Sequence, residues 1–164
     1  MAMTNDVAVL HFKKHNFQAT CYNAIGCTVR YNHHNQIEDP PERVSPPPVG
    51  ADYREAWGSV EVGIPNFPGP AIVQWKSMDG MQHEAKIDIG AIFRDQRVVH
   101  RVPVHEVPEQ WLHQDLMPDI YLEINDKSIQ VFMQAHVPTK HLQDASRPLS
   151  DFRDDLIEVW SKTY

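Results

Sequence analysis

The sequence predicts a mainly β protein: an antiparallel β-sandwich-like single domain over 1–164, with one short helix and a long proline-rich loop. Three observations lead to this prediction. Apolar and polar residues alternate along most of the chain, turn residues separate the alternating segments, and 164 residues suffice for one hydrophobic core. We expect about seven to nine strands, as in other sandwiches of this size.

The strands follow from alternation with a period of two. The first alternating segment, 17–31, is one strand or a pair of strands, and further segments lie at 60–64, 71–76, 85–89 and 98–104. Asp79-Gly80 predicts a hairpin turn between 71–76 and 85–89. Segments 120–124 and 129–137, separated by 125–127, form the clearest predicted hairpin.

Helical periodicity appears in two places. Apolar residues at 107, 111, 112 and 116 share one helical face, and Pro108 suits a first turn, so we predict the short helix over 107–116. Residues 152–164 are ambiguous, because a helical stripe competes there with residue types that favour strands.

The longest connection is marked by proline. Five of the thirteen prolines fall between residues 40 and 48, which excludes helix and inner strand, and we interpret 33–56 as one long loop. With Trp57, this segment carries five carboxylates, two arginines and two aromatic residues. A stiff acidic loop with aromatic anchors suits insertion into a basic cleft, and a disordered connector is the alternative. Residues 1–6 show no secretion signal, and we expect a disordered or artificial N-terminus.

Cys21 and Cys27 are the only cysteines of the chain. One extended strand would hold them about 20 Å apart, which is too far for a disulfide. Only a turn over 23–26 would let them bridge. We therefore expect two small buried hydrophobic residues.

Charge and motifs exclude several kinds of function. The formal net charge is −7, so the surface repels nucleic acid and anionic membranes and suits a basic partner. No apolar run is long enough to cross a membrane. The ten histidines show no metal-ligand spacing, and the sequence has no nucleophile elbow and no nucleotide-binding loop. We predict no catalytic residue, no metal site, no cofactor and no nucleic-acid partner.

Several segments resemble β-rich periplasmic immunity proteins and lipoproteins associated with type VI secretion lipase effectors. The likeness spans 17–164 and is carried by segments 22–32, 73–76, 118–124 and 150–164. It implies a protein that binds and blocks a cognate toxin in the periplasm, with phospholipases of the phospholipase D type among such toxins. It also implies a strand over 152–164. The chain departs from the family in lacking a lipobox cysteine and in its proline-rich insertion after Tyr31.

Together these features predict a non-enzymatic inhibitor that occludes the cleft of a phospholipase-type toxin. A phosphate-binding cleft is basic, so acidic loop residues would enter it. The expected toxin-binding residues are Glu38, Asp39, Glu42 and Asp52 for charge and Tyr53 and Trp57 for anchoring, with His33, His34, Asp79 and Met81 as secondary candidates. The alternatives are a periplasmic ligand- or protein-binding module and a small hydrolase. The expected location is the periplasm, with the cytoplasm as the alternative.

Overall fold

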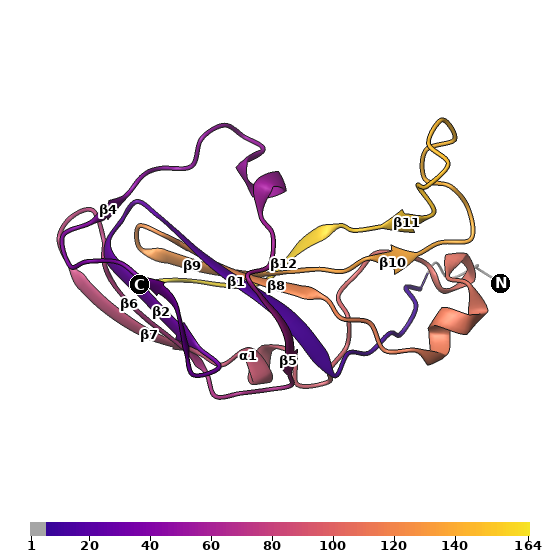
Figure 1. Cartoon of the computed structure of the whole chain (residues 1–164), viewed down its shortest axis with the longest axis horizontal. Coiled ribbons are helices and arrows are strands. Elements are labelled where there is room, and N and C mark those ends of the chain that lie inside the picture. Colours follow the sequence, from indigo (N-terminus) through magenta and orange to yellow (C-terminus); the bar gives the residue numbers. More distant parts are fainter. Residues whose placement is uncertain (1–5) are drawn as a thin grey trace.

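A computed structural model describes residues 6–164 and shows two β-sheets packed as a sandwich-like domain (Figure 1). Sheet I contains, in spatial order, β12 (Leu156–Thr163), β9 (Ser128–Gln134), β8 (Asp119–Asn125), β1 (Lys14–Tyr22) and β5 (Glu61–Pro65). Sheet II contains β3 (His34–Glu38), β2 (Ala24–Tyr31), β6 (Ala71–Lys76) and β7 (Gln82–Ile87), and β4 (Val44–Ser45) also pairs with β2. The short strands β10 (Val137–Pro138) and β11 (Phe152–Arg153) pair with each other.

The mainly β prediction is confirmed, since strands make up 46% of the chain and helices 10%. The pairing is antiparallel except between β1 and β8, which run parallel with Phe17 opposite Ile120. The hairpins β6–β7 and β8–β9 form where the sequence predicts them. The expectation for residues 1–6 falls, apart from Asp6, outside the described residues.

Alternation along the strands reflects which faces are covered. In β7, buried and exposed residues alternate strictly, because only one face meets the core. The central residues of β8, 120–124, are all buried. Both faces of this strand are therefore covered, one by the core and the other by a segment that crosses the outside of sheet I.

A sharp corner joins the two sheets between β1 and β2. Asn23 lies there with φ 49°, and the chain leaves sheet I and enters sheet II. This corner brings Cys21 and Cys27 together in a disulfide with Cα atoms 6.6 Å apart. The prediction of two unpaired cysteines is wrong, because it assumed an extended chain between them.

The prediction of a single loop over 33–56 is also wrong. Asn32 and His33, with φ of 52° and 62°, form a tight turn that pairs β3 back onto β2. Irregular chain is limited to 39–43 and 46–52, the two proline-containing stretches on either side of β4. A 3₁₀ turn, η1 (Tyr53–Ala56), then follows before the chain enters β5.

Helical structure is placed differently from the prediction. The one short α-helix, α1 (Ile89–Ile92), begins where the Asp88 side chain accepts a hydrogen bond from the Ala91 N–H at 3.0 Å. Residues 107–116 contain only η3 (Glu109–His113), preceded by η2 (Val104–Glu106). Pro103 and Pro108 are extended, which breaks this stretch into single turns.

Two further segments test the sequence interpretation. The predicted strand at 98–104 is absent, because 97–103 makes only isolated bridges to the N-terminal segment. At the other end of the chain, 156–163 is the strand β12 that the resemblance implies. Strand composition outweighs the helical stripe there, since β12 pairs along its length with β9.

Candidate functional site

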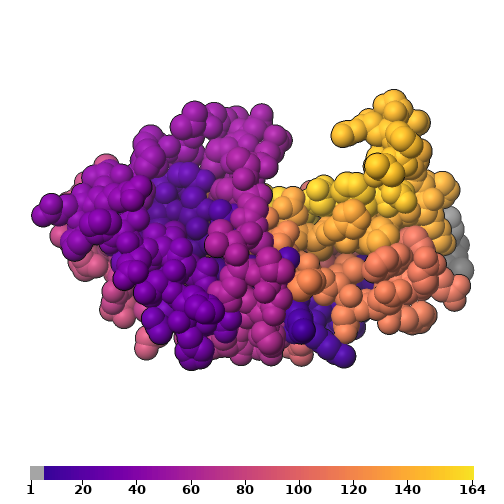
Figure 2. All heavy atoms as spheres, in the orientation of Figure 1, coloured from indigo at the N-terminus to yellow at the C-terminus, as the bar shows by residue number. Residues whose placement is uncertain are grey.

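Two segments project from the same side of the molecule and are separated by a notch (Figures 1 and 2). We call residues 46–57 the strap and residues 139–151 the distal loop. The strap leads from β4 to β5 across sheet I, and the distal loop connects β10 to β11. In Figure 2 the floor of the notch is orange and yellow, so it is formed by the C-terminal part of the chain.

A buried carboxylate on β8 holds the strap in place. Glu123 has a fully buried side chain, and its Oε2 atom lies 2.9 Å from Nη2 of Arg54. Its Oε1 atom accepts a hydrogen bond from the Tyr53 hydroxyl at 2.5 Å. Burial and this hydrogen bond raise the pKa of Tyr53 to about 12. The hydroxyl therefore stays protonated and continues to donate to Glu123 at neutral pH.

Aromatic packing completes the attachment of the strap. The Trp57 indole N–H donates to the Tyr22 hydroxyl at 2.9 Å, and its ring lies 5.3 Å from that of Tyr121 and 5.5 Å from that of Phe132. Tyr53 and Trp57 thus face the chain's own sheet. The sequence predicts them as anchors for a partner, whereas here they anchor the strap.

The predicted acidic residues do not gather at one place. Glu38 pairs with Thr28 in sheet II, and the half-buried Asp39 lies 3.9 Å from the exposed Arg43, in an ion pair. Glu42 is exposed in the turn before β4. Asp52 alone belongs to the strap, where it is exposed just before η1.

The secondary candidates occupy opposite ends of sheet II. His33 and His34 lie at the β2–β3 turn, where His34 Nδ1 is 2.9 Å from Glu61 Oε1. Asp79 and Met81 lie at the β6–β7 turn. Hydrogen bonds from Ser77 and the Met81 N–H, with Lys127 at 3.0 Å, hold the pKa of Asp79 well below its usual range. These four residues therefore do not form one continuous binding surface.

The tips of the two projections carry apolar side chains that sequence reasoning missed. Val49 of the strap is 88% exposed and Leu149 of the distal loop is 83% exposed, the highest values for large hydrophobic residues within 6–164. Each follows a proline, Pro48 and Pro148, which restricts the backbone at the tip. The Pro48-Val49 and Pro148-Leu149 pairs were the available signal.

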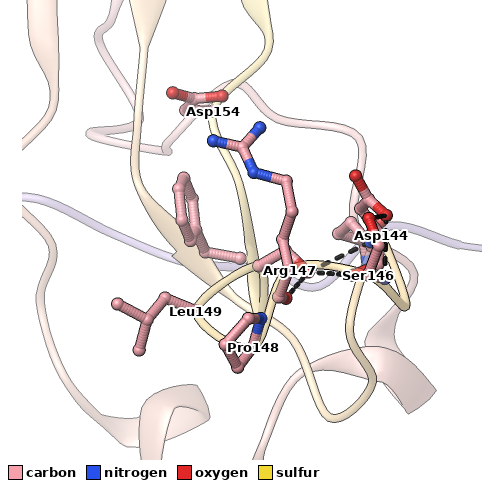
Figure 3. Close-up of a pocket in the computed structure, with 9 residues that line it drawn as sticks. Asp144, Ser146, Arg147, Pro148, Leu149 and Asp154 are labelled. Atoms are coloured by element: carbon pink, nitrogen blue, oxygen red, sulfur yellow. Dashed lines mark hydrogen bonds between the residues drawn. The ribbon is translucent and has the colours of Figure 1, made fainter.

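A hollow of about 580 Å³ lies beneath the distal loop (Figure 3). Its lining residues are Gln143, Asp144, Ser146, Arg147, Pro148, Leu149, Ser150, Phe152 and Asp154. Ser150 braces the loop, since its Oγ atom accepts from the Asp144 N–H at 3.0 Å and donates to the Arg147 carbonyl at 2.7 Å. In Figure 3 the Arg147 side chain extends toward Asp154, so opposite charges face each other across the hollow.

Metal-binding clusters, membrane-spanning helices and similarity to known proteins also bear on the site. Residues 6–164 hold no group of three or more His, Cys, Asp or Glu side chains placed to bind a metal ion. No helix in this part of the chain is long and apolar enough to cross a membrane. Comparison of the chain with protein families, with curated proteins and with solved structures gives no significant match.

Proposed function

We propose that this chain is an immunity protein, a binding protein that inhibits a toxic enzyme by covering its active-site cleft. The partner we propose is an antibacterial type VI secretion toxin of the phospholipase class, with the phospholipase D type as first candidate. The toxin class comes from the resemblance. The observation that carries the binding function is the pair of projections on one side of the molecule (Figure 2), each of which carries a strongly exposed aliphatic residue.

Both projections are stiff before any partner arrives. The strap is held through Glu123, and the distal loop is braced through Ser150. Exposed apolar side chains on rigid supports favour association, because they gain burial and lose little conformational entropy. This supports binding by preformed tips, with Val49 and Leu149 as contacts and Tyr53 and Trp57 as supports.

Charge supports a basic partner. The net charge is −7, and exposed carboxylates lie on the strap at Asp52 and Glu55 and near the distal loop at Asp154. A cleft that binds phosphodiesters presents cationic side chains. Opposite charges accelerate encounter and make it sensitive to salt. The expected association is therefore faster at low ionic strength.

The disulfide supports an extracytoplasmic location. Cys21 and Cys27 are bonded, and structural disulfides persist in oxidising compartments such as the bacterial periplasm. We therefore propose the periplasm, where a phospholipase toxin would meet its lipid substrate.

The test combines capture with inhibition. The chain is used as bait in a cell-envelope extract, the bound protein is identified, and its phospholipase activity is titrated with the purified chain. We expect activity to fall in proportion to added chain up to a fixed stoichiometry. Val49→Ser with Leu149→Ser should weaken inhibition by about tenfold or more.

A matched control carries the same change elsewhere. Val62 in β5 and Met78 at the β6–β7 turn are exposed outside both projections, and Val62→Ser with Met78→Ser should leave inhibition unchanged. Capture of a protein whose activity the chain does not reduce would reject the inhibitor function. Equal loss in both double variants would reject the two tips as the contact surface.

The hollow supports a second candidate, a ligand-binding module. Its volume lies in the range of small-molecule sites, and Phe152 and Leu149 give it apolar walls. A small ligand bound there would raise the unfolding temperature in proportion to the logarithm of its concentration. Phe152→Ala should abolish that shift without affecting toxin inhibition.

A further inference from the structure

We infer that the first part of β12 is a docking edge, which accepts an extended, basic segment of the partner as an additional strand. The segment would enter the notch between the strap and the distal loop. This inference deepens the proposed function and rests on it for the identity of the partner. It specifies how the two chains join and which chemistry the partner's segment has.

The free edge of β12 provides the hydrogen-bonding groups. β12 is the outermost strand of sheet I and pairs only with β9, where Leu156 lies opposite Gln134 and Glu158 opposite Phe132. No strand within 6–164 pairs with its other side. Alternate residues therefore direct their N–H and C=O groups away from the sheet, which is the arrangement that accepts a further strand.

Two contacts place this edge between the walls of the notch. Asp154, just before β12, lines the hollow beneath the distal loop. Gln130 links Glu158 to the strap, since its Nε2 atom donates to Glu158 Oε1 at 2.7 Å and its Oε1 atom accepts from Arg54 Nη2 at 3.4 Å. Residues 154–158 thus extend from one wall to the other, as the start of β12 does in Figure 1. β12 begins at Leu156 and a bulge between Glu158 and Trp160 ends the regular pairing, so 154–158 consists of three strand residues and the two residues before them, and this edge fits a short extended segment.

The first residues of β12 lack two of the features that normally prevent strand addition, proline and lysine. Proteins protect exposed edges with proline, lysine, short strands or bulges. β5 ends in Pro65 and contains Gly63, and β7 presents Lys86. The stretch 154–158 contains no proline and no lysine, and the half-buried Leu156 and Ile157 lie at its centre. β3, the other outer strand of sheet II, also contains no proline and no lysine, so the position beside the notch is what distinguishes the β12 edge.

The charges at this edge select a basic segment. Asp154 and Glu158 are exposed at its two ends, and Asp52 and Glu55 are exposed on the strap. Asp155 is already paired with Arg153 at 2.8 Å, so its charge contributes little to the electrostatic potential at the edge. A strand with Lys or Arg on one face would pair with these carboxylates, while aliphatic residues on its other face would contact the exposed tips at Val49 and Leu149.

The probe is a synthetic decapeptide in which Lys and Val alternate, compared with the same peptide carrying Glu in place of Lys. Amide hydrogen exchange of the chain is measured residue by residue at millimolar peptide. We expect the Lys peptide to slow exchange of the outward-facing amides of 154–158 by about fivefold or more. The Glu peptide and the amides of β7 should show no change.

Charge reversal provides the matched variants. Asp154→Lys with Glu158→Lys should abolish the protection by the Lys peptide and allow protection by the Glu peptide. Glu84→Lys with Asp95→Lys makes the same change in net charge at exposed positions outside the strap and the distal loop and should preserve the original preference. Both variants alter exposed side chains, and their unfolding temperatures establish that the fold is retained.

The outcomes separate this inference from the proposed function. Absence of protection at 154–158, or equal protection by the two peptides, overturns the docking edge. A toxin that is inhibited while these amides exchange at the free rate also overturns it and leaves the inhibitor function in place. Protection by the Lys peptide without inhibition of any captured toxin retains the docking edge and rejects the toxin as its partner.

Discussion

Arg54 Nη2 and Glu123 Oε2 lie 2.9 Å apart and join the strap to the centre of sheet I. The Glu123 side chain is fully buried, and a buried carboxylate is tolerated only when it is paired and hydrogen-bonded. Arg54 and Tyr53 meet this requirement together. The position of the strap therefore follows from the need to neutralise Glu123, and the exposed tip at Val49 depends on an ion pair beneath it.

Arg54→Ala should destabilise the protein, because it leaves the Glu123 charge buried and unpaired. We expect a loss of about 2–4 kcal/mol in the free energy of unfolding, measured by urea denaturation. Arg54→Ala combined with Glu123→Gln should recover part of this loss, since the remaining buried group is neutral. Arg43→Ala removes a long ion pair between the exposed Arg43 and Asp39 and should cost less than about 1 kcal/mol. Equal effects of Arg54→Ala and Arg43→Ala would show that the buried pair does not hold the strap.

Reduction of the Cys21–Cys27 disulfide should also lower stability. The bond closes a short loop with a sequence separation of 6. In the chain-entropy account a loop of this size contributes about 2 kcal/mol. Urea unfolding with and without a reductant measures this difference. Cys21→Ala with Cys27→Ala should unfold at the same urea concentration in both conditions. The disulfide would be contradicted if the reductant left the urea unfolding of the wild-type chain unchanged and both cysteines could be alkylated without reduction.

Gly26→Ala should separate the proline-rich turn from β2. A Cβ atom at Gly26 would lie 2.7 Å from the carbonyl oxygen of Pro41, and the residue has φ +60°. Gly50, in the strap, has φ +80° but open space around it. We expect Gly50→Ala to cost about 1 kcal/mol from backbone conformation alone. Gly26→Ala should cost at least twice as much, and equal thermal unfolding of the two variants would contradict the close approach.

The fold was predictable wherever one face of a strand meets the core. Period-two alternation identifies β6 and β7, because burial of one face requires it. The β8–β9 hairpin was found from its two apolar segments and the turn residues between them. The corner at Asn23 was not predictable, since alternation continues on both sides of it. The predicted helix at 107–116 fails for a related reason: apolar spacing alone does not show that Pro103 and Pro108 restrict the chain to single turns.

The candidate site was less predictable than the fold. The sequence indicates a stiff, aromatic, acidic segment before Trp57, and the strap lies there. It does not indicate which way the aromatic side chains face. That direction depends on Glu123, which is 70 residues from Tyr53 along the chain. The sequence did not indicate the distal loop, because the exposure of its apolar residue and the hollow beneath it depend on how the folded chain places this loop beside β12.

Two buried histidines should make stability fall in mildly acidic solution. His15 lies between Asn66 and the Tyr31 hydroxyl, at 2.7 and 2.9 Å, and burial lowers its pKa from the ordinary 6.5. Burial likewise lowers the pKa of His100, whose Nδ1 atom is 3.0 Å from the Val102 nitrogen. A neutral imidazole fits both arrangements, since one nitrogen donates and the other accepts.

The unfolded chain takes up a proton on each of these imidazoles near pH 6.5, whereas the folded chain resists protonation. Stability is therefore complete above pH 6.5 and falls as the pH decreases toward the lowered pKa values of the folded state. Two such groups give a slope of at most about 2.7 kcal/mol per pH unit. Urea unfolding at intervals between pH 5 and 8 measures this slope, and His15→Gln or His100→Gln should each reduce it. A flat profile between pH 5 and 6.5 would show that the two imidazoles are protonated as readily in the folded chain as in the unfolded one.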